Sequence, residues 1–387
     1  MKIPRNKINN YTDDIVSERQ RFLNQQTKKE AFHLHKYSFN PEVTEGNIEN
    51  FIGVAQVPVG LAGPLLVNGE HAKGEFLIPM ATTEGTLVAS YNRGMKLCSA
   101  LGGVKTTVIE DKMNRAPIFV FKDARHAREF GKWVDNNYAQ IKELSESTSS
   151  IAKLIDIEQY TASKMIWLRF NFHTGDAAGQ NMVTRATREA CNWILAQKPK
   201  GLEKFSLAAN FDTDKKHSYI NYLKTRGKRV VAEITVPKDL IKETFRVDAK
   251  TMAYQRGLST TGSLLSGSVN NGAHSANGIT AMFIACGQDV ANVAESSAAI
   301  IYPEILDNGD YYFSITIPAL IVATYGGGTS LPTQRECLEI MDCYGSGKVN
   351  KFAEIVAATA LCGELSLSGA VLADEWVSSH ESLGRNR

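Results

Sequence analysis

The pattern of hydrophobic and polar positions predicts a chain that mixes helices and strands. Residues 12–50 begin with polar helical spacing (DDIVSERQRFLNQQ), whereas residues 55–70 are rich in Gly, Pro and Val, which is typical of short strands and turns. Within residues 81–103, apolar side chains recur at helical spacing and two glycines end the segment. We expect Thr83 to cap this helix and Glu84 to lie in its first turn, near the positive end of the helix dipole.

From Val108 the pattern changes to that of a smaller module. Residues 106–123 predict a strand, a turn and a strand, and residues 123–145 predict a helix. Residues 165–175 (MIWLRFNFHTG) predict an apolar strand, which a second helix follows over roughly 177–198. This β-β-α-β-α order is typical of a small α+β module inserted into a larger domain.

Beyond this module the patterns of a larger domain resume. Residues 311–324 are strand-like, residues 257–278 are rich in Gly, Ser and Asn, and a long helix is expected from about Lys351. We therefore predict an α+β fold in which a small module is inserted into a larger domain.

Composition and charge narrow the functional classes. With 387 residues, of which 43% are hydrophobic and 22% charged, the chain is long enough for one large globular domain and a smaller one. Its 43 Lys and Arg residues against 41 Asp and Glu residues give a formal charge of +2. This balance argues against nucleic acid or another acidic polymer as a partner.

Cysteine usage and the apolar stretches indicate a soluble, cytoplasmic protein. The six cysteines include no CxxC pair, which suits reduced thiols better than disulfides or a metal site. The first twenty residues lack the apolar core of a signal peptide, and glycines and Glu364 interrupt the apolar stretch at 353–373. We expect no membrane span and no bound metal.

Two segments have residue types suited to binding an anion or an oxyanion. Residues 174–182 (TGDAAGQNM) end a strand and open a helix, with Asp176 as the expected N-cap and small side chains that would let a pyrophosphate approach. A purely structural cap is the alternative. In residues 213–216 (TDKK), a lysine fixed by a carboxylate would suit a developing oxyanion, although such a tetrapeptide also forms solvated turns.

Three further candidates lie nearer the C-terminus. Asp289, in the motif GQD, follows a buried segment. His380 is expected in the last turn of the C-terminal helix, where the dipole supports the protonated form that a general acid needs. Both residues are also consistent with ordinary surface positions. The GGGT motif at 326–329 is either a flexible turn or a loop that lets a phosphate approach the backbone.

These segments occur together in a known order. The chain resembles the 3-hydroxy-3-methylglutaryl-CoA (HMG-CoA) reductase family, class I type, in a soluble prokaryotic form, from about residue 45 to 385. The motifs that carry the resemblance are, in chain order, ENFIGVAQVPVGLAGPL, PMATTEGTLVASYNRG, GDAAGQN, TDKK, GQD, GGGT, GELSL and a final SH. The resemblance implies a fold in three parts. These are 1–109, an N-terminal helical segment and the first part of a large substrate-binding domain; 110–206, an inserted small ferredoxin-like cofactor domain; and 207–387, the rest of the large domain with a C-terminal catalytic helix and tail.

The resemblance implies a four-electron reduction of HMG-CoA to mevalonate and free CoA by two nicotinamide hydrides, a step of isoprenoid biosynthesis. Carried over by motif, the catalytic residues are Glu84, Lys215, Asp289 and His380. Lys215 would hold or protonate the carbonyl oxygen, and His380 would protonate the departing CoA thiolate. Glu84 would serve as a proton donor, kept protonated by burial and by the carboxylate of Asp289.

The resemblance also implies binding residues and a subunit arrangement. Relatives contact CoA at the positions of Asn92 and Arg93. The residues implied around the hydroxymethylglutaryl group are Asn210, Asp214, Lys216 and Asn277. Those implied around the cofactor, NADPH with NADH as a possibility, are Ser149, Asp176, Ala177, Ala178, Gly179, Gln180, Asn181, Gln288, Gly326, Gly327 and Gly328. The active site is expected between two subunits of a homodimer or of a dimer of dimers.

The chain departs from its relatives where they anchor the distal carboxylate of the substrate. Those positions hold Ala208, Thr107 or Val108, and Leu258, so the anchoring charge would have to come from Lys105, Arg115 or Arg256. Two alternatives therefore stay open beside HMG-CoA reduction. One is the same reduction of a different acyl-CoA, and the other is a non-catalytic regulatory paralogue. For the 2′-phosphate of NADPH, Lys153 is the nearby cation.

Overall fold

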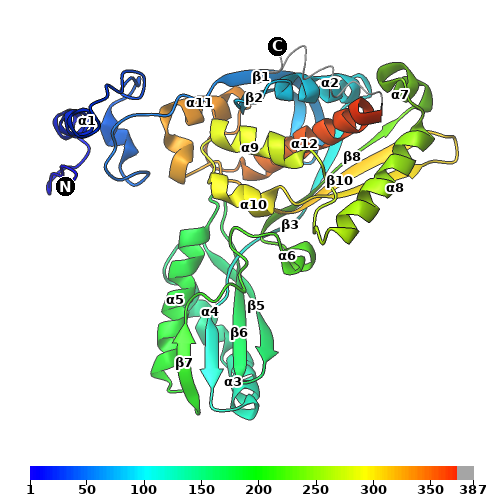
Figure 1. Cartoon of the computed structure of the whole chain (residues 1–387). Helices are drawn as coiled ribbons and strands as arrows, with labels where there is room; N and C mark the ends of the chain where they lie inside the picture. The colour runs from blue at the N-terminus through cyan, green and yellow to red at the C-terminus, as the bar shows by residue number, and fades with distance from the viewer. Residues whose placement is uncertain (373–387) are drawn as a thin grey trace.

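The computed structural model describes residues 1–372, and these form a large lobe from which a smaller lobe projects (Figure 1). An N-terminal arm with helix α1 (Asp13–Thr27) stands at one side of the large lobe. The buried guanidinium of Arg19 ties the arm together, because it donates to the carbonyl oxygens of Pro4, Asn10 and Phe51. His380 lies outside the described residues.

The large lobe is built on a mixed sheet with the strand order β2-β1-β3-β8-β10-β9. All neighbouring strands are antiparallel except β1 and β3, which are parallel. The strands are β1 (Val59–Gly69), β2 (Lys73–Ala81), β3 (Val104–Arg115), β8 (Gly227–Val236), β9 (Ile300–Ile305) and β10 (Tyr311–Leu320). The predicted strand at 311–324 is confirmed by β10, which pairs with β8 on one side and β9 on the other.

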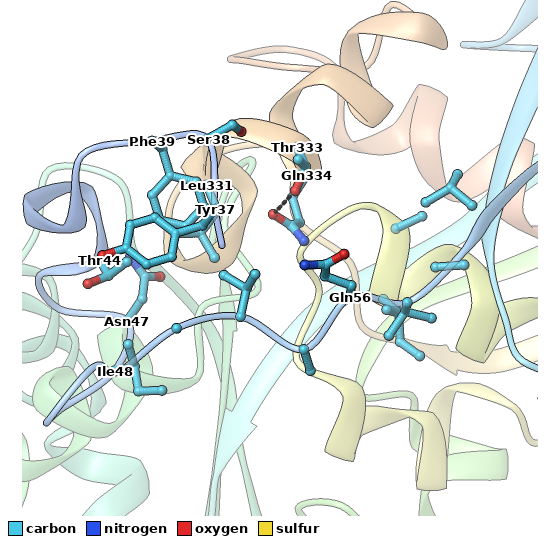
Figure 2. Close-up of a pocket in the computed structure, with 18 of the residues that line it drawn as sticks. Tyr37, Ser38, Phe39, Thr44, Asn47, Ile48, Gln56, Leu331, Thr333 and Gln334 are labelled. Carbon is cyan, nitrogen blue, oxygen red and sulfur yellow. Dashed lines mark hydrogen bonds between the residues drawn. The ribbon is translucent and has the colours of Figure 1, made fainter. Parts of the chain in front are cut away.

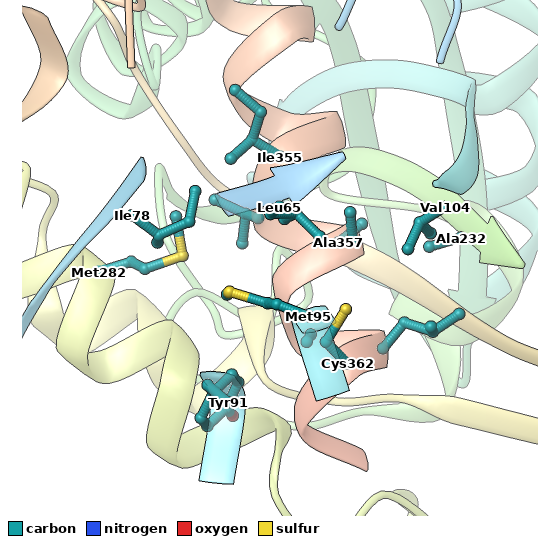
Figure 3. Close-up of a cluster of buried hydrophobic side chains, with 14 of the residues drawn as sticks. Leu65, Ile78, Tyr91, Met95, Val104, Ala232, Met282, Ile355, Ala357 and Cys362 are labelled. Carbon is teal, nitrogen blue, oxygen red and sulfur yellow. The ribbon is translucent and has the colours of Figure 1, made fainter. Parts of the chain in front are cut away.

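Helix α12 (Val349–Leu372) forms the centre of the large lobe and packs against α2, α9 and β8. Gly94 of α2 allows the close approach, because a Cβ there would lie 2.0 Å from the carbonyl oxygen of Cys362. Figure 3 shows Met95 and Cys362 in this core beside Leu65 and Ile355. Such dense apolar packing is the main stabilising contribution to the lobe.

Both glutamates of α12 that lie in its apolar stretch are fully buried and satisfied by backbone donors. Glu354 accepts from the N–H groups of Glu70, His71 and Ala72, which fixes the turn between β1 and β2. Glu364 accepts from the N–H groups at the start of α9 and from Arg256. In the described part of the chain, α12 is the one helix long and apolar enough to cross a membrane, but 78% of its most apolar window is buried in the protein.

The remaining helices of the large lobe surround α12 and the sheet. The α-helices are α2 (Leu87–Ala100), α6 (Tyr219–Lys224), α7 (Lys238–Phe245), α8 (Ala249–Leu265), α9 (Ser275–Ala285), α10 (Val293–Ser296) and α11 (Pro332–Ile340). Short 3₁₀ helices cover Pro41–Thr44, Val290–Asn292 and Gly327–Ser330.

The small lobe has the ferredoxin-like order β-α-β-β-α-β, with strands arranged β7-β4-β6-β5. Its elements are β4 (Ile118–Phe121), α3 (Ala124–Asn136), α4 (Tyr138–Glu146), β5 (Lys153–Ala162), β6 (Met165–His173), α5 (Gln180–Ala196) and β7 (Leu202–Ser206). Strand β3 joins the lobes, because its end pairs with β6 while its earlier part pairs with β8. The α+β fold with a ferredoxin-like insertion is thus confirmed.

Alternate residues of β6 point to opposite sides of the strand and contact different lobes. Ile166, Leu168, Phe170 and Phe172 enter the core of the small lobe, where the side chains of α3, α4 and α5 meet them. The intervening Arg169 is also buried, but it donates to Asn221 and to the carbonyl oxygen of Thr225 in the large lobe. One face of β6 therefore builds the small lobe and the other attaches it to the large one.

The structure corrects several local expectations. Helix α2 begins at Leu87, with Thr86 as N-cap at φ 71°, because Thr82 Oγ1 accepts from the N–H of Glu84 and turns the chain before the helix starts. Thr83 is not the cap. The helix expected over 123–145 divides into α3 and α4 at Asn137. Strands β5 and β7 were absent from the sequence prediction, and α8 extends through part of the Gly/Ser-rich stretch.

Candidate active site

Lys215 and Asp289 form an ion pair between two loops that are distant in sequence. Lys215 Nζ lies 3.0 Å from Asp289 Oδ2, and both side chains are a little over 40% exposed. Lys215 lies in the loop between β7 and α6 and has left-handed backbone at φ 58°. Asp289 caps the 3₁₀ helix Val290–Asn292 through the N–H of Ala291. A solvent-accessible ammonium held by a carboxylate is thus available to a ligand.

A buried charged cluster supports the loop that carries Lys215. Glu295 Oε1 accepts from the N–H of Lys215 at 3.0 Å and from Arg226 Nη1 at 2.5 Å. Arg226 Nη2 also donates to Asp214 Oδ1 at 2.9 Å. Burial raises the pKa of Glu295 to about 7, whereas the positive charge of Arg226 opposes that rise.

A cavity of about 380 Å³ opens beside Asp289. Its lining combines residues from the GQD motif, the glycine loop and the start of the small lobe's α5 region: Gly287, Gln288, Asp289, Ala178, Gly326, Gly327 and Gly328. Gly287 and Gly328 are in backbone contact, because a Cβ on Gly287 would lie 2.2 Å from the carbonyl oxygen of Gly328. Added side chains at Gly326 and Gly327 would meet nothing within 4 Å, so the backbone of this loop faces open space.

Helix α5 presents an uncapped N-terminus at this cavity's edge. Its N-cap is Gly179, at φ 82°, and no side chain caps the helix in the described part of the chain. The expected cap, Asp176, instead accepts from the N–H groups of Gly347, Lys348 and Val349 and so caps α12. The prediction that Asp176 caps α5 is wrong, because the start of α12, 173 positions away at Val349, uses its carboxylate. Free N–H groups at a helix start favour an anion.

The first residue of α5 links the small lobe to the other two loops. Gln180 Nε2 donates to Asn292 Oδ1 at 2.7 Å and lies 3.5 Å from Asp214 Oδ1. Since Asp214 precedes Lys215 and Asn292 follows Asp289 by three positions, one side chain joins all three motifs. The motifs TDKK, GQD and GDAAGQN therefore meet at one place although they are far apart in the sequence.

Comparison with known proteins decides the family of the chain. The family model described as hydroxymethylglutaryl-coenzyme A reductase matches residues 15–385, nearly the whole chain. The chain belongs to the hydroxymethylglutaryl-coenzyme A reductase family.

Similar proteins cover the chain almost completely. The 3-hydroxy-3-methylglutaryl-coenzyme A reductase of Methanocaldococcus jannaschii is 44% identical over 373 residues, which are 95% of this chain and 92% of that protein. The reductase of the same name from Pyrococcus horikoshii is 45% identical over 364 residues, or 91% of this chain and 87% of that protein. Among solved structures, the class II 3-hydroxy-3-methylglutaryl-CoA reductase from Streptococcus pneumoniae bound to NADPH aligns with a TM-score of 0.68 at 18% identity, covering 92% of this chain and 97% of that chain. The last match shows that the fold is shared.

In this member of the reductase family, Glu84 stands apart from the Lys215–Asp289 pair. Glu84 is exposed before the start of α2, and its side chain makes no hydrogen bond or ion pair within residues 1–372. It does not lie in the first turn of the helix and is not buried, contrary to expectation. The structure thus brings together Lys215 and Asp289, leaves Glu84 separate, and does not describe His380.

The residues implied around the substrate are engaged in hydrogen bonds within the protein, both local and between distant segments. Asn92 Oδ1 accepts from the N–H of Gly63, and Arg93 donates to the hydroxyl and carbonyl oxygens of Ser366 on α12. Asn277 Nδ2 lies 3.2 Å from His274 Nδ1. Of the remaining three, Asn210 is exposed with φ 61°, Lys216 Nζ donates to the carbonyl oxygen of Asp214, and the Asp214 carboxylate accepts from Arg226.

The side chains of two residues implied around the cofactor form hydrogen bonds with the protein backbone. Gln288 is buried, accepts from the N–H of Ala323 and donates to the carbonyl oxygens of Cys286 and Ala323. Ser149 Oγ accepts from the N–H groups of Ile151 and Ala152. Gln288 therefore shapes the cavity wall, and Ser149 orders the turn before β5. Asn181 is exposed in the first turn of α5.

Two of the candidate carboxylate anchors are engaged inside the protein. Arg115 Nη1 lies 2.5 Å from Asp212 Oδ2, and Arg256 Nη2 lies 2.7 Å from Glu364 Oε2. The side chain of Lys105 is exposed on β3. A substrate carboxylate would thus have to share Arg115 or Arg256 with an existing partner.

A larger cavity of about 770 Å³ lies between the N-terminal arm and α9 and α11. Figure 2 shows Tyr37 and Phe39 of the arm beside Leu331, and Gln334 directed toward Gln56. Its lining includes none of the residues implied in catalysis, and it borders the smaller cavity at Asn47 and Leu331 among others. We assign the chemistry to the smaller cavity because that one holds the Asp289 carboxylate and the glycine loop.

The sequence analysis missed Glu295 and Arg226, the two buried charges under the Lys215 loop. Arg226 follows Thr225 between two polar stretches, and Glu295 follows a run of small and apolar residues. Glu295 could have been noticed as a glutamate in a segment otherwise suited to burial. A buried carboxylate requires charged or N–H partners, so such a residue indicates a buried polar cluster.

Proposed function

We propose that this chain reduces HMG-CoA to mevalonate and free CoA, with two NADPH and two protons consumed per turnover. The observation that carries the proposal is the Lys215–Asp289 ion pair at the cavity formed by the glycine loop and Ala178. A non-catalytic paralogue would have no need to keep an accessible lysine paired in strained backbone. The match to reductases over nearly the whole chain supports the same conclusion.

The residues of the chain fit a nicotinamide cofactor. The uncapped start of α5 offers N–H groups to a pyrophosphate, and the backbone of Gly326 and Gly327 faces open space. We propose that Ala177, Ala178, Gly179 and Gln180 hold the cofactor together with the glycine loop, and that residues 110–206 act as its domain. Bound NADPH supplies the two hydrides of the reaction. Lys153, 57% exposed, is the proposed partner of the 2′-phosphate, and weaker use of NADH is compatible with this site.

In the proposed mechanism, Lys215 stabilises the negative charge that develops on the carbonyl oxygen as each hydride adds. Asp289 holds the ammonium in place through the 3.0 Å ion pair. The first reduction converts the thioester to a hemithioacetal, which breaks down to mevaldehyde and CoA thiolate. We propose that His380 protonates this thiolate and that Glu84 provides a proton in the aldehyde reduction.

We propose a homo-oligomer of class I type in the cytoplasm, with each active site at a subunit interface. The exposure of Glu84, which makes no hydrogen bond or ion pair to Lys215 or Asp289 within residues 1–372, supports completion of the site by a second subunit. The motif set supports class I, as does the low 18% identity to the class II structure. All six cysteines are buried and unpaired, which supports a reducing compartment.

A panel of acyl-CoA thioesters with NADPH and NADH tests the proposal. We expect NADPH oxidation with HMG-CoA and formation of mevalonate. The second candidate, reduction of another acyl-CoA, is motivated by the engagement of Arg115 with Asp212 and of Arg256 with Glu364. Turnover of another thioester with none of HMG-CoA would favour that candidate, and no turnover of any thioester would favour a non-catalytic role.

A further inference from the structure

One short segment, residues 289–296, contacts Lys215 at both ends. At the side-chain end, Asp289 Oδ2 lies 3.0 Å from Lys215 Nζ. At the backbone end, Glu295 Oε1 accepts from the Lys215 N–H at 3.0 Å. The segment consists of a 3₁₀ helix followed directly by α10, so the two carboxylates have a nearly fixed spacing.

Glu295 is buried, and both of its carboxylate oxygens have hydrogen-bond partners in the protein. It is 1% exposed and its ion-pair partner Arg226 is fully buried. Glu295 Oε1 accepts from both Arg226 Nη1 and the Lys215 N–H, while Asn221 Nδ2 lies 3.3 Å from Glu295 Oε2. Water does not compete for these groups, so the geometry of the cluster is more restricted than that of a surface ion pair.

The backbone of Lys215 needs such support. Its φ of 58° lies in the left-handed region, which a side chain with a Cβ adopts only where the surroundings fix it. Asp214, the residue before it, is bound through its carboxylate to Arg226, the same guanidinium that binds Glu295. The Arg226–Glu295 pair therefore fixes the backbone on both sides of the peptide bond that precedes Lys215.

We propose that Glu295 is a positioning residue for Lys215, which directs the lysine ammonium toward the reacting carbonyl by fixing the backbone from which it extends. This inference rests on the proposed function, because it takes Lys215 as the group that stabilises the oxyanion. Glu295 itself touches neither substrate nor cofactor. Its effect is on the orientation of the ammonium, which Asp289 alone holds only from the side-chain end.

If Glu295 had only a structural role, its removal would lower stability but leave the turnover of folded protein unchanged. Glu354 provides a matched control for that case. Glu354 is also a fully buried glutamate that accepts backbone N–H groups, but it supports the turn between β1 and β2. Removing either carboxylate leaves buried donors unpaired and lowers the melting temperature. Only the loss of Glu295 should change the turnover of protein that remains folded.

The test compares Glu295→Ala, Glu295→Gln and Glu354→Ala with the unmodified full-length protein. Activity with HMG-CoA and NADPH is measured at a temperature where circular dichroism shows each variant folded. We expect kcat of Glu295→Ala to fall about a hundredfold, because a misplacement of about 1 Å near a reacting centre has that effect, while KM for both substrates changes little. Glu354→Ala should keep kcat within about twofold, since its site lies away from the reaction.

Glu295→Gln keeps the test decisive if the alanine variant does not fold. The amide has the size of the carboxylate, but it lacks the negative charge that pairs with the buried Arg226, and its NH2 group would face Asn221 Nδ2, which is also a donor. We therefore expect kcat to fall by about tenfold. Unchanged kcat in the folded Glu295 variants would overturn the inference alone, as would an equal loss in Glu354→Ala. An unmodified protein that does not oxidise NADPH with HMG-CoA would instead overturn the proposed function, and the inference with it.

Discussion

The ammonium of Lys215 and the carboxylate of Asp289 lie 3.0 Å apart although 74 positions separate them in the chain. The pair lies at the meeting point of the TDKK loop, the GQD turn and the start of α5. Because both side chains remain more than 40% exposed, the contact leaves the lysine accessible to a substrate oxygen. Ion pairs of this exposure contribute little to stability, so a functional reason for the contact is the better explanation.

Replacing Lys215 by alanine should abolish most of the activity without unfolding the protein. The lysine contributes charge to the transition state and little packing, and loss of one oxyanion partner typically costs a hundredfold to about a thousandfold in kcat. Steady-state NADPH oxidation and thermal denaturation measure both effects. Lys164→Ala is the matched control, because Lys164 is a similarly exposed lysine 2.8 Å from Glu203 and lies on the small lobe. Comparable turnover of Lys215→Ala and Lys164→Ala would contradict the assignment.

His380→Gln should separate the two half-reactions. If His380 protonates the departing CoA thiolate, the variant should be strongly impaired with HMG-CoA but much less with mevaldehyde, because aldehyde reduction releases no thiolate. The comparison is made within one protein preparation and so controls for misfolding. An equal loss in both reactions would show that His380 has a different role.

Asp176→Ala should lower the free energy of unfolding and leave the KM for NADPH nearly unchanged. The carboxylate accepts from three N–H groups at the start of α12, and loss of a helix cap costs about 1–2 kcal/mol in the free energy of unfolding. Chemical denaturation and the KM for NADPH are the two measurements. Asp123→Ala, which removes the cap of α3, is the control for a cap remote from the site. A raised KM for NADPH with unchanged stability would show that Asp176 contacts the cofactor instead.

His274 should make the stability of the protein fall as the pH drops below neutrality. Burial lowers the pKa of His274 from its usual 6.5, an effect that the charge of Glu364 opposes and that of Arg93 reinforces. Below pH 6.5 the unfolded chain takes up a proton at this residue while the folded protein does not, so stability present above that pH is lost as the pH falls. Denaturant unfolding of the unmodified protein and of His274→Asn between pH 7.5 and 5.5 measures the difference. We expect a shallower decline in the variant, and parallel curves would refute the role of His274.

Much of the fold follows from local patterns in the sequence. Strand β6 alternates apolar and other residues along MIWLRFNFH, and α12 has a long apolar stretch, so both were predicted close to their observed positions. Strand β5 was missed because its sequence, KLIDIEQYTA, is too polar to indicate a strand without its partner β6. The start of α2 was misplaced because the Thr82 hydroxyl stabilises a turn that helix propensity does not reveal.

The sequence predicted those residues of the candidate site that belong to recognisable motifs. It did not predict those whose role depends on contacts between distant segments. Lys215 and Asp289 were identified by resemblance, and the structure places them together. That Asp176 caps α12 depends on a contact between residues 172 positions apart, which no local pattern encodes. The same reason hid Glu295, since its partner Arg226 lies 69 positions earlier in the chain.

The stoichiometry of the complete reaction tests the central claim most directly. The purified protein is incubated with limiting HMG-CoA and excess NADPH, and NADPH oxidised, CoA thiol released and mevalonate formed are quantified. Our account predicts two NADPH oxidised for each CoA and each mevalonate, because one site performs both hydride additions. Absence of NADPH oxidation with HMG-CoA, or a ratio of one with release of the aldehyde, would contradict it.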